Sequence, residues 1–411
     1  MKLLKRISSK LLYYENWRIS GDPYILGCVL FWTFVSILSV YSATGTLAFK
    51  KMHGNTEHYL YSHGLKFIFG LGAMYIFHRF DYRWFRKVNG LLYIFSIAFL
   101  ILGQVIGSSL NEAKRWVSIF GVTVQPADFA KLALLIFLSA MLARHQNQAE
   151  SKGSWPFTIK FLIFSLIPVG LIGLSDISTA MMVLMTVGVM MIVGRVPLMK
   201  PFLICCVVIP MAVTIVYAFG SRGNTAISRV EKYWEAVHDP TQASFQSKMG
   251  YVAIGNGGVT GLGPGNSEQK NFLPHPYSDF IFAIIIEEYG LFGAFLVIAV
   301  YLLFLWRCFA QITYTQQPFG GLLSAGIGFS IVFQAFLNMG VTVGLLPVTG
   351  LPLPMISMGG SSLLFIGASI GIVLGVSRSA ETPDFEVEEG DTEEQKTAPV
   401  RMGSKKFSMR T

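Results

Sequence analysis

The residues most able to do chemistry stand at the edges of apolar runs. In the stretch from Leu273 to Glu288, a polar loop turns into an apolar run at Asp279. A carboxylate at such a boundary could take a proton from a hydroxyl group. Ser278 or Asp279 could instead cap the helix that follows, because Ser and Asp are favoured at that position. Local sequence leaves both interpretations open.

Two further carboxylates follow in the same run. Glu287 and Glu288 lie eight and nine residues after Asp279. An ionisable group inside an apolar helix is costly and normally faces a polar cavity. The helical period of about 3.6 residues places Glu287 and Asp279 near the same face. We therefore expect Glu287 to face a polar cavity on that side.

A second polar stretch runs from Asn111 to Lys131. Asp128 and Lys131 are spaced i, i+3 and can pair on one helical face. Pro126 suits a first helical turn, so a helix is predicted to begin there. The pair could bind substrate or could be an interfacial salt bridge. Lys114 and Arg115, followed by Trp116, could bind substrate or anchor the chain among lipid headgroups.

Two shorter polar segments complete the set. Asp176 lies in a connection of two or three residues, where it could be a ligand, a turn residue or a helix cap. The segment Gly261 to Lys270 mixes glycines with polar groups that could approach a diphosphate. It is not a dinucleotide-binding fingerprint, because no strand precedes it and no Walker sequence occurs.

The elements that carry these residues are predicted to cross a membrane. Of the 411 residues, 53% are hydrophobic and only 13% are charged, against about 25% charged in ordinary soluble proteins. We predict an all-α integral membrane protein with about ten spans. Their approximate bounds are 24–43, 64–78, 89–107, 129–143, 156–174, 178–194, 201–219, 280–305, 319–343 and 354–376.

The distribution of basic residues predicts the orientation. Lys and Arg are retained on the cytoplasmic side, and the cluster from Arg79 to Lys87 is the clearest case. This places both termini in the cytoplasm, with a basic N-terminal segment at 1–23 and a membrane domain at 24–378. The tail at 379–411 carries eight acidic residues between Glu381 and Glu394 and is predicted to be disordered.

One long loop is predicted on the outer face, between spans seven and eight. It covers about 220–278 and contains a helix-like piece from Ser228 to Val237. Loops of this length usually carry function, although a solvated lid is an alternative. The net charge of +9 suits anionic lipids or a phosphorylated lipid. No soluble basic face for nucleic acid is evident.

Together these residues suit a lipid-linked anionic substrate. A carboxylate could activate a sugar hydroxyl, while cations offset charge on a diphosphate leaving group. A lipid transporter would need the same groups, and the residues alone do not separate the two. A divalent cation could assist the diphosphate, but no ligand cluster is visible, so metal is left unknown.

At these stretches the sequence closely resembles the SEDS family of bacterial cell-wall proteins, which comprises FtsW, RodA and SpoVE. The resemblance covers about Tyr24 to Arg378. It is carried by Lys114-Arg-Trp116, Gln125 to Lys131, Gly261 to Lys270, Leu273 to Glu288, and Asn338 through Gly344 to Ser362. The Asn-Ser-x-Gln-Lys form of the glycine segment looks like the FtsW and SpoVE branch, which favours division over elongation.

The resemblance implies a peptidoglycan glycosyltransferase that polymerises lipid II by an inverting single displacement. Asp279 matches the catalytic aspartate, and undecaprenyl diphosphate is the leaving group. Substrate-binding roles are implied for a further set of residues: Lys114, Arg115, Asp128, Lys131, Asp176, Gln269, Lys270, Glu287 and Ser361. The chain departs from the family pattern at Thr123, where Arg is usual, and at Asp128, where Glu is usual. The motif around Asp176 also differs.

The resemblance also implies partners and a location. The expected partners are lipid II, a class B penicillin-binding transpeptidase with one membrane anchor, and other divisome membrane proteins. The expected location is the bacterial inner membrane, at the division septum. Two rival functions remain, a lipid II flippase and a non-catalytic divisome scaffold.

Overall fold

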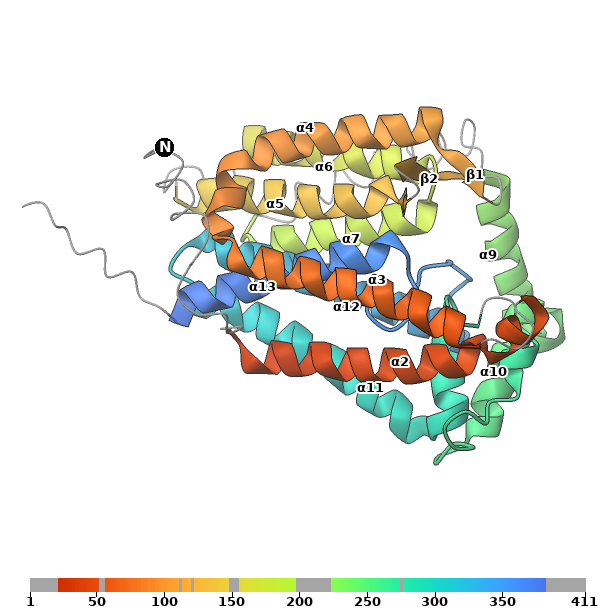
Figure 1. The fold of residues 1–411 in the computed structure, drawn as a ribbon. Helices are drawn as coiled ribbons and strands as arrows, with labels where there is room; N and C mark the ends of the chain where they lie inside the picture. Colours follow the sequence, from red (N-terminus) through yellow and green to blue (C-terminus); the bar gives the residue numbers. More distant parts are fainter. Residues whose placement is uncertain are drawn as a thin grey trace, which may run out of the picture.

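The computed structural model describes residues 21–51, 56–110, 113–119, 122–147, 155–196, 223–273 and 276–381. Long helices run side by side through the molecule (Figure 1). Nine of them match nine of the ten predicted spans: α2 (Pro23–Lys51), α3 (Thr56–Arg79), α4 (Tyr82–Ile106), α5 (Pro126–Asn147), α6 (Trp155–Gly173), α7 (Ile177–Val193), α11 (Ile281–Tyr314), α12 (Pro318–Thr342) and α13 (Ser361–Glu381).

Seven of these helices are long and apolar enough to cross a membrane. α3 and the 17-residue α7 do not meet that measure among the described residues. The predicted span at 201–219, most of the N-terminal segment at 1–23 and nearly all of the tail lie outside the described residues. The chain is a multi-pass membrane protein, and ten spans with cytoplasmic termini stay a prediction.

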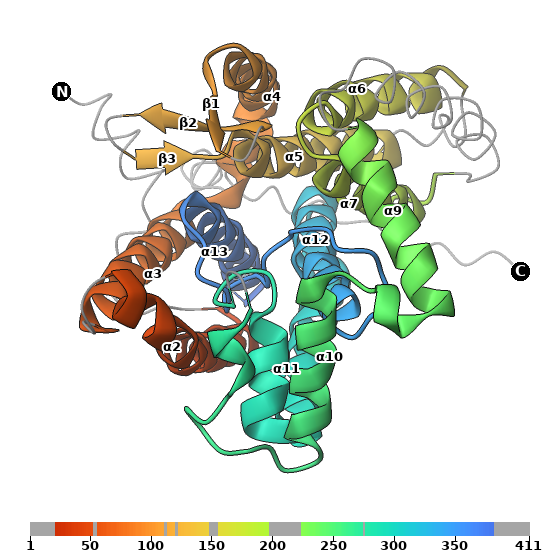
Figure 2. The ribbon, with the colours of Figure 1, turned by 90° about the vertical axis from the view of Figure 1, so that its right-hand side faces the viewer.

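α3 and α13 pack against each other with their backbones in close approach. Two glycines of α13 lie very near the backbone of α3. A β-carbon at Gly367 would overlap the Gly70 carbonyl oxygen, and one at Gly371 would overlap that of Met74. Small residues spaced four apart allow such an approach inside a membrane. α12 lies between α5 and α7 on one side and α11 and α13 on the other (Figure 2).

One end of the bundle carries the shorter elements (Figure 1). A three-stranded antiparallel sheet joins α4 to α5 and consists of β1 (Ser108–Leu110), β2 (Ala113–Ile119) and β3 (Val122–Val124). This sheet was not predicted. α9 (Gly223–His238) contains the helix-like piece expected at Ser228 to Val237. A 3₁₀ turn, η1 (Pro240–Gln242), leads to α10 (Phe245–Gly257), and η2 (Gln269–Asn271) follows.

Two predicted spans differ in shape from the expectation. The last span was expected to begin at 354, but the chain is non-helical from 345 to 360 and α13 begins at Ser361. Prolines at 347, 352 and 354 disfavour helix there. α11 is broken at Gly290, where φ is 66° and ψ is −167°. A β-carbon at Gly290 would overlap the Val259 carbonyl oxygen, so only glycine fits.

Candidate functional site

A polar cavity of about 180 Å³ lies where the sheet, α5, α7, α12 and the segment before α13 meet. It gathers side chains from three of the four polar stretches predicted from sequence. Asp128 and Lys131 come from α5, Asp176 precedes α7, and Ser278 precedes α11. The wall is completed by a set of further residues: Trp116, Gln125, Thr179, Gln334, Gly350, Leu351, Pro352, Met358, Gly359, Gly360 and Ser362.

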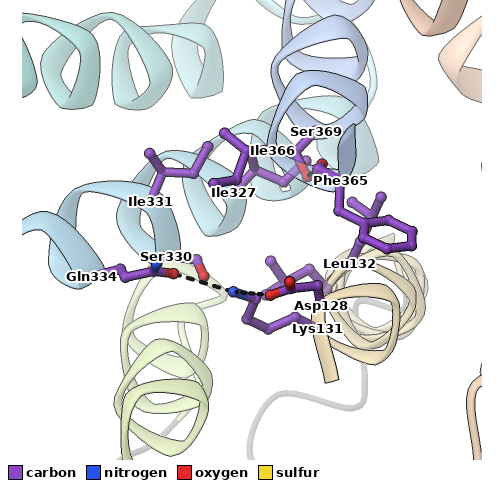
Figure 3. Close-up of a pocket in the computed structure, with 11 residues that line it drawn as sticks. Asp128, Lys131, Leu132, Ile327, Ser330, Ile331, Gln334, Phe365, Ile366 and Ser369 are labelled. Atoms are coloured by element: carbon purple, nitrogen blue, oxygen red, sulfur yellow. Dashed lines mark hydrogen bonds and ion pairs between the residues drawn. The ribbon is translucent and has the colours of Figure 1, made fainter. Parts of the chain in front are cut away.

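The predicted pairing of Asp128 with Lys131 is confirmed. Lys131 Nζ lies 3.2 Å from Asp128 Oδ1, and the side chains are only 14% and 8% exposed. Lys131 Nζ also donates to Gln334 Oε1 at 3.2 Å (Figure 3). α5 begins at Pro126, as expected, so the pair stands on its first turns. Asp128 Oδ2 is buried and accepts no hydrogen bond from the described residues.

Asp176 is a helix cap, one of the alternatives considered for it. Its carboxylate accepts from the Thr179 backbone N–H at 3.3 Å and from Thr179 Oγ1 at 2.9 Å. The side chain is 5% exposed and lines the same cavity. A capping carboxylate at this place therefore also contributes negative charge to the cavity wall.

Asp279 lies just before α11 and does not cap it. Phe280 occupies the cap position, and within the described part of the chain no side-chain capping hydrogen bond is made from it. The alternative that Ser278 or Asp279 caps the helix is therefore wrong. The Asp279 carboxylate is half-buried and accepts from Ser278 Oγ at 2.8 Å. Its Oδ2 would lie 3.7 Å from a β-carbon at Gly350, a residue of the cavity wall.

Three hydrogen bonds to the backbone hold the Asp279 segment. Asn338 Nδ2 donates to the Asp279 carbonyl at 2.8 Å. Ser357 Oγ donates to the Ser278 carbonyl at 2.6 Å, and the Met358 N–H donates to the Tyr277 carbonyl at 2.9 Å. The donors come from α12 and from the non-helical segment before α13. The carboxylate is thus carried on backbone fixed from two sides, as a positioned reactive group requires.

Glu287 was expected to face a polar cavity, but it faces the glycine segment from Gly261 to Lys270. It is fully buried, and its carboxylate accepts from Ser267 Oγ, from the Gln269 backbone N–H at 3.2 Å and from Asn256 Nδ2 at 3.4 Å. It anchors the glycine segment and does not line the cavity. The argument from helical period fails because Asp279 lies outside the helix. Glu288 is buried beside it and accepts from Ser42 Oγ of α2.

The remaining residues predicted to bind substrate are, where their side chains are described, not among those that line the polar cavity. Gln269 is buried in η2, and Lys270 Nζ donates to Ser42 Oγ at 3.3 Å, on the side of Glu288. Ser361 Oγ accepts from the Gln125 backbone N–H at 3.0 Å and so ties α13 to the start of α5. Lys114 and Arg115 belong to β2, but their side chains lie outside the described part of the chain.

Sequence reasoning missed the polar face of α12. Gln334 and Asn338 are 4% and 1% exposed. Gln334 bonds Lys131 and the Pro352 carbonyl, and Asn338 bonds the carbonyls of Asp279 and Leu351. Their spacing of four residues inside an apolar run was the available signal, because polar groups one turn apart share a face. Among the described residues, no three His, Cys, Asp or Glu side chains converge as metal ligands.

The fold and the cavity define a polytopic membrane protein with a polar site inside its helix bundle. Residues 23–382 match the family described as cell cycle protein and named for FtsW, RodA and SpoVE. The chain belongs to the FtsW, RodA and SpoVE family.

Named relatives and solved structures are similar over most of their length. "Probable peptidoglycan glycosyltransferase FtsW" of Geobacter sulfurreducens is 33% identical over 361 residues, covering 87% of this chain and 95% of the relative. The protein of the same name from Haemophilus influenzae is 32% identical over 386 residues, covering 92% and 96%.

Two solved structures have the same fold. A chain from work on structural coordination of polymerization and crosslinking by a peptidoglycan synthase complex is 25% identical, with TM-score 0.66, covering 89% of this chain and 99% of that one. Thermus thermophilus rod shape determining protein RodA is 24% identical, with TM-score 0.63 and the same coverage.

Proposed function

We propose that this chain is a peptidoglycan glycosyltransferase that polymerises lipid II, with Asp279 as the general base. The observation that carries the proposal is the half-buried Asp279 carboxylate, held on fixed backbone next to a polar cavity. The acceptor hydroxyl of the sugar would give its proton to Asp279 and attack the anomeric carbon of the donor. Undecaprenyl diphosphate would leave from the opposite face, so a single displacement needs only one base.

Lys131 is the cation best positioned to meet the diphosphate. Its ammonium has three donors, of which two are directed to Asp128 and Gln334 at 3.2 Å. The third is available to a ligand in the cavity. Negative charge that develops on the leaving group would be stabilised there, because a fixed cation in a water-poor site acts strongly. The contacts with Asp128 and Gln334 would hold the lysine side chain at the cavity wall.

The polymerisation assay with purified protein and lipid II tests the proposal. Asp279→Asn keeps the shape of the side chain but removes the base, and we expect glycan synthesis to fall by about 100-fold to 10,000-fold. Asp239→Asn, in the turn between α9 and α10, is the matched control and should polymerise like the wild type. Full activity of the Asp279 variant would reject that residue as the base.

The two rival functions, a lipid II flippase and a divisome scaffold, predict different experimental results. Movement of lipid II across liposomes without polymer would indicate a flippase. Support of division by the Asp279→Asn gene would indicate a scaffold. Either result would overturn the enzyme proposal.

The proposed partners and location follow from the reaction. New strands must be crosslinked, so we propose a class B penicillin-binding transpeptidase beside this chain, with other divisome proteins, at the division septum of the inner membrane. The similarity to the chain from a peptidoglycan synthase complex supports this pairing.

A further inference from the structure

A second cavity lies outside the helix bundle, between α9 and α10. Its volume is about 280 Å³, and its floor is the segment Leu346 to Val348, which follows α12. α9 and α10 lie at the end of the bundle that faces the viewer in Figure 2. We call this cavity the α9–α10 groove. It shares no lining residue with the polar cavity beside Asp279.

The groove is cationic and aromatic on its α9 side. Arg229, Lys232 and Tyr233 line it, while the acidic residues of the same helix, Glu231 and Glu235, do not. At about 100° per residue the acidic pair falls on another side of α9, so the helix separates its charges. Across the groove, α10 contributes Gln246 and Tyr251. Such a lining suits a ligand that is acidic and also has apolar faces.

Two α9 side chains donate hydrogen bonds to backbone carbonyls in the segment after α12. Tyr233 Oη donates to the Leu345 carbonyl at 2.8 Å. Arg229 Nη1 lies 3.3 Å from the Val348 carbonyl oxygen and 3.5 Å from that of Thr349. These contacts tie α9 to the floor. Lys232 is exposed, and it provides the ammonium that can reach a bound anion.

The floor of the groove leads directly to Asp279. Val348 packs against a small apolar cluster that contains Phe280, the residue after Asp279. Two residues further along, Gly350 belongs to the wall of the polar cavity, and a β-carbon there would lie 3.7 Å from Asp279 Oδ2. A polymer leaving Asp279 across this short segment would arrive in the groove.

We propose that the α9–α10 groove binds the glycan strand that has already been polymerised, with its peptides attached. The inference rests on the proposed function, because the occupant is the product of that reaction. Sugar rings would lie against the tyrosine side chains, which present an apolar ring and a polar tip. Lys232 would pair with a peptide carboxylate, a charge-assisted contact. The groove would thereby retain the strand between successive additions.

Direct binding tests the groove without requiring catalysis. The probe is a fluorescently labelled, uncrosslinked glycan strand with its peptides, added to the full chain in nanodiscs of neutral lipid. We expect Lys232→Glu to raise the Kd about tenfold or more, as for loss of a hydrogen bond to a charged group. Lys248→Glu, on α10 but outside the groove lining, makes the same charge change and should bind like the wild type. For strands without peptides, Lys232→Glu and Lys248→Glu should have the same Kd.

Polymer length gives an independent measurement. In the polymerisation assay, Lys232→Glu should give shorter strands than Lys248→Glu. Equal strand binding by the two variants would overturn the inference. A defect of Lys232→Glu that is seen only with a transpeptidase present would also overturn it, because the groove would then bind a protein partner. Lys232-dependent displacement of the strand by anionic lipid would assign it to headgroups. Absence of polymer from the wild type would instead reject the proposed function, so the two failures are distinguishable.

Discussion

Asn338 holds the backbone of Asp279: its side-chain Nδ2 lies 2.8 Å from the Asp279 carbonyl oxygen. The same nitrogen donates at 2.8 Å to the Leu351 carbonyl, in the segment that lines the polar cavity. A single amide on α12 therefore connects the proposed base to the opposite wall of its site. Asn338 is proposed as a positioning residue, since its side chain holds the backbone that carries the proposed base.

Replacement of Asn338 should lower both stability and activity, and the activity loss should exceed that of a control with a similar lost hydrogen bond. Asn338→Leu leaves two buried carbonyls without their donor, and we expect a loss of about 2 kcal/mol or more in unfolding free energy. Because Asp279 would shift, polymerisation should fall by about 100-fold. The control is Thr342→Val, one turn further on, which loses one hydrogen bond to the Asn338 carbonyl. Thr342→Val should lower the melting temperature slightly and leave activity intact. A similar activity loss in both variants would contradict the positioning role of Asn338.

The pair Asp128 and Lys131 should show strong coupling. Removing one partner leaves the other charge poorly compensated in a mostly buried site, so Asp128→Asn and Lys131→Met should each destabilise the protein. The double variant should cost less than the sum, with a coupling energy of about 1 to 3 kcal/mol measured by denaturant unfolding. Additive effects would show that the two charges do not interact.

The pair Asp22 and Arg307 is a control for function. Their side chains meet at 2.6 Å where α2 begins, away from the polar cavity. Breaking it should also destabilise the chain, but surviving folded protein should still polymerise. Folded protein with a broken Asp128–Lys131 pair should not.

Gly261 should tolerate no side chain. Its φ is +80°, and a β-carbon would overlap the Glu288 carbonyl oxygen where the glycine segment crosses the break in α11. Gly261→Ala should therefore release the segment and expose it to protease. Gly265 also has φ +80°, but a β-carbon there would meet no atom of the described residues within 4 Å. Gly265→Ala should cost only about 1 to 2 kcal/mol of backbone strain, and equal protease sensitivity of the two variants would refute the close approach.

The turn between α9 and α10 should loosen in acid. Hydrogen bonds from the Thr241 hydroxyl and N–H hold the pKa of Asp239 below its usual value. A carboxyl whose pKa is lowered by folding stabilises the native state above its unfolded pKa, and this contribution is lost as pH falls through the folded pKa. Hydrogen exchange at the Thr241 amide should accelerate, relative to its intrinsic rate, over that acidic window. Asp239→Asn should abolish the pH dependence.

Local pattern predicted the elements whose formation depends on neighbours in sequence. The start of α5 at Pro126, the Asp128–Lys131 pair and the helix at α9 all follow from spacings of a few residues. The sheet between α4 and α5 escaped prediction because its strands are only three to seven residues long. The non-helical stretch at 354–360 was wrongly included in the last span because its residues are nearly as apolar as a span.

Apolar length and helical period are local properties, so they were enough to predict a helical membrane protein and the polar groups that its apolar runs must accommodate. Tertiary structure alone decided which of those groups meet. Ser357 reaches the Ser278 carbonyl across 79 residues of chain, while Glu287 turns away to hold the loop at Ser267. Such pairings depend on how separate helices pack and where the backbone breaks, and no local spacing encodes either.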